Sequence, residues 1–321
     1  MGGAGAAEVV TLGESMVLFV PDQAGPLRHA ARFSRALAGA ESNVAIGLCR
    51  LGHATEWIGL VGQDEFGAFI LSTLRGEGVG VRFARRDGRG PTGLMFKEPA
   101  AGRDSRVFYY RRGSAASLLD EADVPGAAFS GARWLHLTGI TPALGPGPRR
   151  AVAAAVRAAA AAGLRISFDP NYRARLWPPA EAAPVLRDLA GAADVLLCSE
   201  DEAAMLYGTA DPAAVHAAAG GRPGQLVAVK RGDRGAAFFA DGEAWALPAW
   251  PLRAVVEPTG ADDALAAGLI AGLLQGRAPA EAGRMGAACG ALACTVAGDW
   301  EGAPERPELE AMLSGADAPR R

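Results

Sequence analysis

The chain has 321 residues, half of them hydrophobic and about a fifth charged, which suffices for one large domain or two domains of ordinary size. Its net charge is −3 and it has neither a basic run nor a basic stripe with aromatic residues, so nucleic acid is not an expected partner. There is no signal-peptide pattern and no apolar stretch of the roughly 18 residues that span a bilayer, so we expect a soluble, cytoplasmic protein without a membrane partner.

The segment up to residue 80 alternates between strands and helices. Its first apolar stretch, "VVTLGESMVLFVP", predicts strand structure that is interrupted at Gly13-Glu14. A helix is expected over 41–52, where Gly52 favours a left-handed C-terminal cap, and a second over 64–78. Between these helices, "EWIGLVG" predicts a strand.

The pattern changes between about 80 and 115. The segments "VRFARRD", "TGLMFKE" and "RVFYYRR" are short, rich in β-formers and separated by Gly, Pro and Asp turns. This spacing predicts antiparallel strands.

From residue 133 onward, short apolar strands alternate regularly with helices. Strands are expected over 133–139, 164–170, 194–199 and 225–232, and helices over 149–163, 179–192, 200–208 and 257–274. This alternation predicts an α/β fold with a doubly wound, mostly parallel sheet and helices on both faces. Ligands of such folds lie beyond the carboxyl ends of the strands, where this chain carries Gly139, Asp169, Asn171 and Arg173.

Cysteines and histidines indicate no metal centre. The four cysteines form no C-x-x-C pair, and most lie in apolar patterns, so reduced core thiols are expected. The four histidines are scattered along the chain.

The stretch "EPTGADDALAAGLIAGLL" (257–274) joins a glycine turn to a helix that begins with two aspartates. Unpaired N–H groups and a partial positive charge make a helix start attractive to anions. A carboxylate at that point can also take the proton of a bound hydroxyl. The alternative is that Asp262 or Asp263 only caps the helix.

Three motifs resemble those of the ribokinase-like (PfkB) sugar kinases. "TGADDALAAG" resembles their second signature, D-x-x-G-A-G-D-x-F, and "LVAVKRGDRGA" resembles their K-x-G-x-x-G stretch. "AGAESNVAIGLCRLG", followed by "IGLVGQDEFG", resembles their N-terminal signature. The resemblance covers nearly the whole chain, and it implies one ribokinase-like domain over 1–321. It also implies a small antiparallel β lid from about 15–35 and 80–115, with ATP and Mg²⁺ as cofactors. Because lid strands with exposed apolar faces tend to pair, we expect a homodimer or higher homo-oligomer.

The resemblance also implies roles for individual residues. Asp263 matches the catalytic base, and the backbone of Gly260, Ala261 and Asp262 matches the anion hole that holds charge during phosphoryl transfer. The residues that match the nucleotide and phosphate site are Lys230, Gly232, Gly235, Ser199 and Glu202, with Gly260 shared between the two sites. Of these, Glu202 would organise Mg²⁺ through water, while Ser199 replaces the usual asparagine.

Three further stretches resemble one branch of the family, the 2-keto-3-deoxygluconate kinases. They are "FYYRRGSAAS" (108–117), "DPNYRARLW" (169–177) and "GDWEGAP" (298–304). The substrate-binding residues implied by the family and branch motifs are Gly39, Asn43, Tyr109, Arg111, Arg173 and Asp299. Guanidinium groups suit the carboxylate of a sugar acid. The implied function is the ATP-dependent phosphorylation of a sugar acid, foremost 2-keto-3-deoxygluconate to its 6-phosphate.

Other interpretations of the same residues stay open. Arg111 and Arg173 could form salt bridges or contact ATP phosphates, and the substrate could be a neutral sugar of the fructose or ribose type, or a nucleoside. Asp64 and Gly67 fit either a helix start or a supporting role near the sugar. Met95 replaces a tyrosine of the branch.

Two departures lie at the anion hole. Glu257 replaces the aspartate before the hole, and Asp262 replaces a glycine within it. The Asp262 carboxylate could turn to solvent or to an arginine and leave the N–H groups free, or it could help to hold Mg²⁺. In the third case it would impair the site, leaving a sugar-acid-binding protein with little catalysis.

Overall fold

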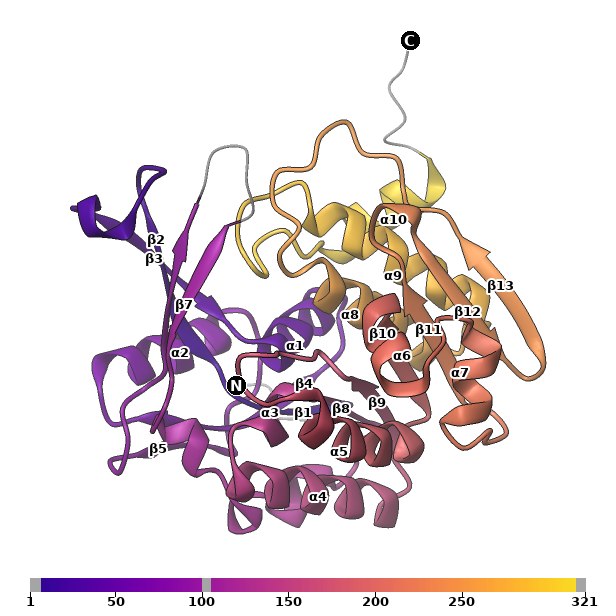
Figure 1. Cartoon of the computed structure of the whole chain (residues 1–321), viewed down its shortest axis with the longest axis horizontal. Helices are drawn as coiled ribbons and strands as arrows, with labels where there is room; N and C mark the ends of the chain where they lie inside the picture. Colours follow the sequence, from indigo (N-terminus) through magenta and orange to yellow (C-terminus); the bar gives the residue numbers. More distant parts are fainter. Residues whose placement is uncertain (1–6, 100–104, 316–321) are drawn as a thin grey trace.

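The structure of the chain is a computed structural model that describes residues 7–99 and 105–315 (Figure 1). Its large sheet has nine strands in the order β13-β12-β11-β10-β9-β8-β1-β4-β5. In chain order these are β1 (Val9–Leu12), β4 (Thr55–Gly62), β5 (Ala84–Asp87), β8 (Trp134–Thr138), β9 (Arg165–Asp169), β10 (Val195–Ser199), β11 (Leu226–Lys230), β12 (Ala236–Ala240) and β13 (Glu243–Leu247). The neighbouring strands β11, β10, β9, β8, β1, β4 and β5 run parallel to one another. Strands β12 and β13 add an antiparallel edge beside β11.

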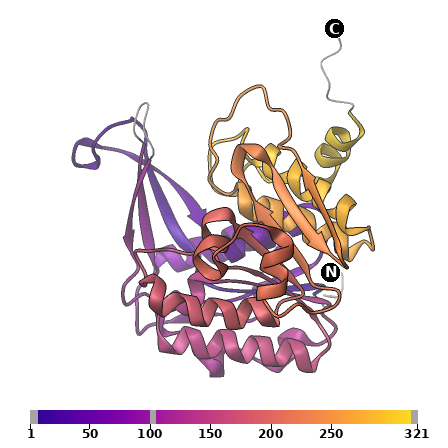
Figure 2. The same cartoon turned by 45° about the vertical axis from the view of Figure 1, so that its right-hand side comes forward.

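Helices cover both faces of the large sheet, as Figure 2 shows. They are α1 (Ala40–Arg50), α2 (Glu65–Gly76), α3 (Ile140–Ala143), α4 (Pro146–Ala161), α5 (Pro179–Ala192), α6 (Glu200–Tyr207), α7 (Pro212–Ala218), α8 (Ala261–Leu274), α9 (Pro279–Ala293) and α10 (Arg306–Ser314). Short 3₁₀ helices lie at Leu27–His29, Ala115–Leu118, Glu121–Asp123, Gly126–Phe129 and Gly232–Arg234.

Alternation along the strands divides the core into layers. In β1, Val10 and Leu12 pack with the layer of α4 to α7, whereas Val9 packs with the layer of α1, α8, α9 and α10. Because side chains of a strand point alternately to opposite faces, each central strand serves both layers. The sheet and helices predicted from the sequence are therefore confirmed as an α/β fold.

A second sheet of four strands, called here the small sheet, stands beside this body (Figure 1). Its order is β3-β2-β6-β7, with β2 (Met16–Pro21), β3 (Phe33–Ala38), β6 (Leu94–Glu98) and β7 (Arg106–Tyr110). The interruption expected at Gly13-Glu14 is the point where the chain leaves the large sheet for the small one. Over the described residues, none of the helices is both long and apolar enough to cross a bilayer.

Two details of the expected β lid are wrong. β5, from "VRFARRD", pairs in parallel with β4 in the large sheet, and β2 pairs in parallel with β6 within the small sheet. The polar composition of β5 suits the edge strand that it forms there. Asp64 caps α2 by accepting the Gly67 N–H at 2.7 Å, which confirms its interpretation as a helix start.

Candidate active site

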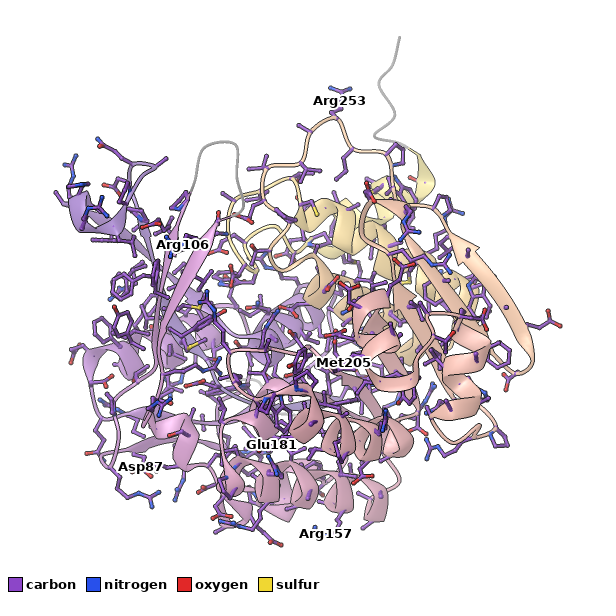
Figure 3. All side chains as sticks on the ribbon, viewed as in Figure 1. Asp87, Arg106, Arg157, Glu181, Met205 and Arg253 are labelled. Atoms are coloured by element: carbon purple, nitrogen blue, oxygen red, sulfur yellow. The ribbon has the colours of Figure 1, made fainter. Side chains whose placement is uncertain are left out.

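A cavity of about 800 Å³ opens at the carboxyl ends of the parallel strands, between the small sheet and the start of α8. β7 contributes Val107 and Tyr109, and α6 contributes Met205, labelled near the centre of Figure 3. The pairing of Thr138 with Asp169, and of Ser199 with Lys230, brings four strand ends to one edge. The cavity therefore lies where a doubly wound sheet binds its ligands.

Most residues expected in the site line this cavity. They are Gly39, Asn43, Tyr109, Arg111, Arg173, Ser199, Glu202, Lys230, Gly260, Asp262, Asp263 and Asp299. Gly232, Gly235 and Ala261 lie outside its lining. The two glycines shape the β11–β12 turn with φ values of 59° and 85°, and Ala261 donates its N–H to the Pro258 carbonyl at 3.2 Å.

Asp263 lies in the first turn of α8 and faces α1. Its Oδ2 accepts a hydrogen bond of 2.8 Å from Asn43 Nδ2. Burial raises the pKa of Asp263 to about 8, and the charges of Asp169 and Asp262 add to this effect while Asn43 opposes it. A carboxyl group that titrates near neutral pH suits a general base.

The Asp262 side chain lies at the cavity beside Lys230. It is 59% exposed, and its Oδ2 lies 3.2 Å from Lys230 Nζ. The orientations expected from the sequence were towards solvent, an arginine or Mg²⁺, whereas the partner in the structure is a lysine of the cavity lining. The register of β11 brings Lys230, its last residue, to this place.

Lys230 bridges Asp262 to a buried aspartate at the end of β9. Its Nζ donates to Asp169 Oδ2 at 2.6 Å, and both side chains are almost completely buried. Burial alone would lower the pKa of Lys230, but Asp169 and Asp262 raise it, so the ammonium stays charged. Burial raises the pKa of Asp169 to about 6, against the pull of Lys230. At neutral pH the three groups carry one net negative charge.

Arg111 is already paired in the cavity wall. Its Nε donates to Glu14 Oε2 at 2.7 Å, and Ser114 Oγ donates to Glu14 Oε1 at 2.7 Å. The salt bridge that the sequence left open for this arginine is therefore present. Sequence reasoning did not assign Glu14 to the site, although an acid at a break between two apolar strands was a usable signal.

Arg173 contrasts with Arg111. It is exposed at the cavity and forms no salt bridge with the described residues. Two acceptors beside the cavity, Asn43 Oδ1 and Asp299 Oδ1, are buried and have no hydrogen-bond partner among the residues that the structure describes. Because buried acceptors are rarely left unpaired, they indicate a ligand that donates hydrogen bonds, as sugar hydroxyls do. Burial raises the pKa of Asp299 to about 6.

Ser199 and Glu202 form a capping box at the start of α6. Glu202 Oε2 accepts the Ser199 N–H at 2.8 Å, and Ser199 Oγ accepts the Glu202 N–H at 3.2 Å. Glu202 Oε1 also accepts the Tyr172 N–H at 2.7 Å. The pattern Ser-x-x-Glu before a helix could have predicted this arrangement.

Glu41 is a second cavity carboxyl group that sequence reasoning missed. Its Oε1 accepts hydrogen bonds of 2.7 Å from Thr138 Oγ1 and from Thr141 Oγ1. Burial raises the pKa of Glu41 despite these bonds. Gly13 packs so closely against this carboxyl group that a Cβ there would lie 2.2 Å from Glu41 Cδ.

The cavity agrees with what the chain resembles among known proteins. The family model described as "pfkB family carbohydrate kinase" matches residues 6–306. A 2-dehydro-3-deoxygluconokinase of Bacillus subtilis is 40% identical over 96% of this chain and 95% of its own length. One of Thermoproteus tenax is 37% identical over 95% and 94%, and a fructokinase of Klebsiella pneumoniae is 34% identical over 95% and 99%.

Among solved structures, a putative ribokinase II from E. coli in complex with ATP and Mg²⁺ superposes with a TM-score of 0.89 at 27% identity. The match covers 96% of this chain and 99% of that one. The sheet order and the cavity described above are thus found in a chain whose sequence resembles known sugar kinases along nearly its whole length.

Proposed function

The chain belongs to the pfkB family of carbohydrate kinases, and from this premise we propose that it transfers a phosphoryl group from ATP to 2-dehydro-3-deoxygluconate. This compound is the 2-keto-3-deoxygluconate of the sequence resemblance, and the 6-hydroxyl is the proposed acceptor. The two similar 2-dehydro-3-deoxygluconokinases support this substrate. The fit of the cavity to a sugar acid is the second support.

The exposure of Arg173 at the cavity is the observation that favours a sugar acid over a neutral sugar as the substrate. Its guanidinium is exposed at the cavity without a salt bridge to the described residues, whereas Arg111 is neutralised by Glu14. A guanidinium that faces a cavity is suited to a substrate carboxylate. Arg173 is therefore the proposed carboxylate partner, and Arg111, with Tyr109 beside it, contributes shape and hydrogen-bonding to the sugar.

Asp263 is the proposed catalytic base. Its carboxylate removes the proton of the substrate hydroxyl as that oxygen bonds to phosphorus, and Asn43 holds the carboxylate in place. Asn43 Oδ1 and Asp299 Oδ1 accept from sugar hydroxyls, which supplies the partners that both atoms are missing. We propose that the backbone N–H groups of Gly260 and Asp262, and that of Ala261 once it leaves the Pro258 carbonyl, stabilise the charge of the phosphoryl group.

The nucleotide is proposed to lie beside the end of β11. Lys230 lies there as an ammonium group paired with Asp169 and Asp262, and Gly232 and Gly235 shape the loop. Within the described residues no cluster of three or more His, Cys, Asp or Glu side chains is arranged to hold a metal ion alone. This fits Mg²⁺ carried largely by phosphates and water, with Glu202 reached through water. When bound with ATP, the ion would neutralise phosphate charge.

The remaining proposals concern the whole chain. We propose one kinase domain, in which the small sheet acts as a lid that excludes water from the sugar. The four cysteines are free, which supports a reducing, cytoplasmic location. Exposed Tyr110 on the small sheet supports a homodimer or higher assembly, which sedimentation equilibrium will test.

A substrate panel tests the proposed function. ADP production is measured with 2-dehydro-3-deoxygluconate, fructose, ribose and adenosine under the same ATP and Mg²⁺ concentrations. We expect kcat/KM to be at least tenfold higher for the sugar acid than for each of the others. A neutral sugar that exceeds the sugar acid by tenfold would overturn the assignment, and binding without ADP production would indicate an impaired site.

Arg173→Met then tests the carboxylate contact. A charged hydrogen bond contributes about 1.5–3 kcal/mol, so KM for the sugar acid should rise at least about tenfold. The matched control is Arg175→Met, because Arg175 lies two residues further on and donates to the Val107 carbonyl. Equal effects of both variants would remove Arg173 as the specific partner.

A further inference from the structure

A lysine of the small sheet contacts the turn that precedes α8. Lys97 lies in β6, and its Nζ donates to Glu257 Oε2 and, at 3.2 Å, to Thr259 Oγ1. Glu257 Oε1 in turn accepts from Thr259 Oγ1 at 2.6 Å and from the Thr259 N–H at 3.2 Å. The three side chains form a closed set of hydrogen bonds between β6 and residues 257–260, called here the α8 turn.

This contact is shielded from water. The side chain of Lys97 is 9% exposed and that of Glu257 is 20% exposed. Burial alone would raise the pKa of Glu257, but the hydrogen bonds from Lys97 and Thr259 lower it, so the ion pair is present at neutral pH. Breaking a buried pair by removal of one partner is costly, because the other charge is left uncompensated.

The α8 turn leads directly into the proposed anion hole. Gly260 has a φ of 82°, and a Cβ there would lie 1.6 Å from the Asp299 carbonyl oxygen, so this backbone has little room to shift. Neither Lys97 nor Glu257 lines the cavity. Lys97 therefore contacts the α8 turn, which is joined to the proposed anion hole, but its side chain does not line the cavity.

We propose that Lys97 is a positioning residue that holds the α8 turn through Glu257 and Thr259, so that the placement of the anion hole depends on the small sheet. The geometry also gives a reason for the glutamate at position 257. Its two oxygens accept from different groups, Oε2 from Lys97 and Oε1 from Thr259, and so join the small sheet to the turn. The kinetic test of this proposal rests on the proposed kinase function. The hydrogen-exchange test described below does not.

The kinetic test compares Lys97→Met, Lys97→Arg and Arg106→Met. Arg106, labelled on the small sheet in Figure 3, forms an exposed pair with Glu98 at 3.7 Å and serves as the control for charge removal. We expect Lys97→Met to lower kcat at least tenfold, while the KM for the sugar acid and the KM for ATP each change less than threefold. Lys97→Arg should recover kcat to within threefold, and Arg106→Met should leave it unchanged.

Glu257→Gln completes the test and decides the outcome if Lys97→Met fails to fold. It should lower kcat as Lys97→Met does, and the double variant should lose no more than either single variant, because both remove the same contact. Unchanged kcat in a folded Lys97→Met or Glu257→Gln variant would overturn the proposal. A rise in sugar KM at unchanged kcat would do the same, because it would indicate direct substrate binding.

A measurement without substrate separates this proposal from the proposed function. Amide hydrogen exchange of the ligand-free protein should become at least tenfold faster over 257–263 in Lys97→Met and stay unchanged in Arg106→Met. If the substrate panel gives no turnover but this acceleration is seen, the proposed function fails and the positioning role stands. Unchanged exchange in Lys97→Met refutes the positioning role whatever the substrate.

Discussion

At the scale of single residues, Asp263, the proposed catalytic base, has a perturbed acidity. Burial at the start of α8 raises its pKa to about 8, so the carboxyl group is mostly protonated at neutral pH. A general base acts in its deprotonated form. In the proposed mechanism, this burial would therefore lower the fraction of the protein whose base is deprotonated at neutral pH.

This predicts a pH profile. Below about pH 8, kcat/KM should rise close to tenfold per pH unit, and above it the curve should level off. Asp263→Asn should lose roughly 10²–10⁴-fold in kcat and the slope with it. Steady-state rates between pH 6 and 9.5 will check both statements, and a flat profile in the unsubstituted chain would contradict the assignment.

The same pKa has a consequence for stability. A folded-state pKa raised above the unfolded value means that the contribution of Asp263 to stability is lost as pH rises towards about 8. The stability advantage of Asp263→Asn over the unsubstituted chain should therefore grow from about pH 4 to pH 8. Urea unfolding at several pH values measures this difference and also shows that the variant folds.

Asp262 gives a second prediction at this scale. Asp169, Lys230 and Asp262 carry one net negative charge close to the proposed phosphate site, so Asp262→Asn should lower KM for ATP. Because the Asp262 side chain is 59% exposed, we expect its repulsion of the ATP phosphates to be worth up to about 1 kcal/mol, which limits the gain to roughly fivefold. The gain should shrink at high salt. Asp188→Asn, an exposed change on α5, controls for net charge.

At the scale of elements, the start of α8 depends on a glycine that only the folded chain explains. Gly260 has positive φ and packs on the Asp299 backbone, so Gly260→Ala adds a clash to conformational strain. Gly276→Ala at the other end of α8 is the matched control, because Gly276 has a φ of 74° and no atom of the described residues lies within 4 Å of an added Cβ. Both should lose about 1–2 kcal/mol of stability from strain, and only Gly260→Ala should also lower kcat, at least tenfold.

Elements were predictable where the pattern was local. The helices α4 and α5 and the strands β8 to β11 agree with their predicted ranges within a few residues, because hydrophobic periodicity reports burial directly. The pairing of β5 with β4 was not predictable, because a short polar strand can join either sheet edge. The antiparallel strands β12 and β13 were not expected, although the apolar segment Ala236–Ala240 was a usable signal.

At the scale of the whole molecule, the antiparallel strand β12 belongs to the core because residues of α8 and α9 pack against it. Phe238 of β12 is fully buried against α9 and stacks on Trp245 of β13 at 5.4 Å. Phe238→Ala should lower the free energy of unfolding by about 3–5 kcal/mol. Because Phe238 does not line the cavity, both KM values should stay within twofold, as urea unfolding and kinetics at 25 °C will check.

The sequence by itself determined the fold class, the family and the candidate base, because hydrophobic periodicity and motifs such as "TGADDALAAG" are local properties of the chain. Only the tertiary structure decided which charges meet. Lys230 pairs with Asp262, Glu14 with Arg111 across 97 residues, and Lys97 with Glu257 across 160 residues. Such pairs depend on strand register and on how the two sheets pack, and no local pattern records either.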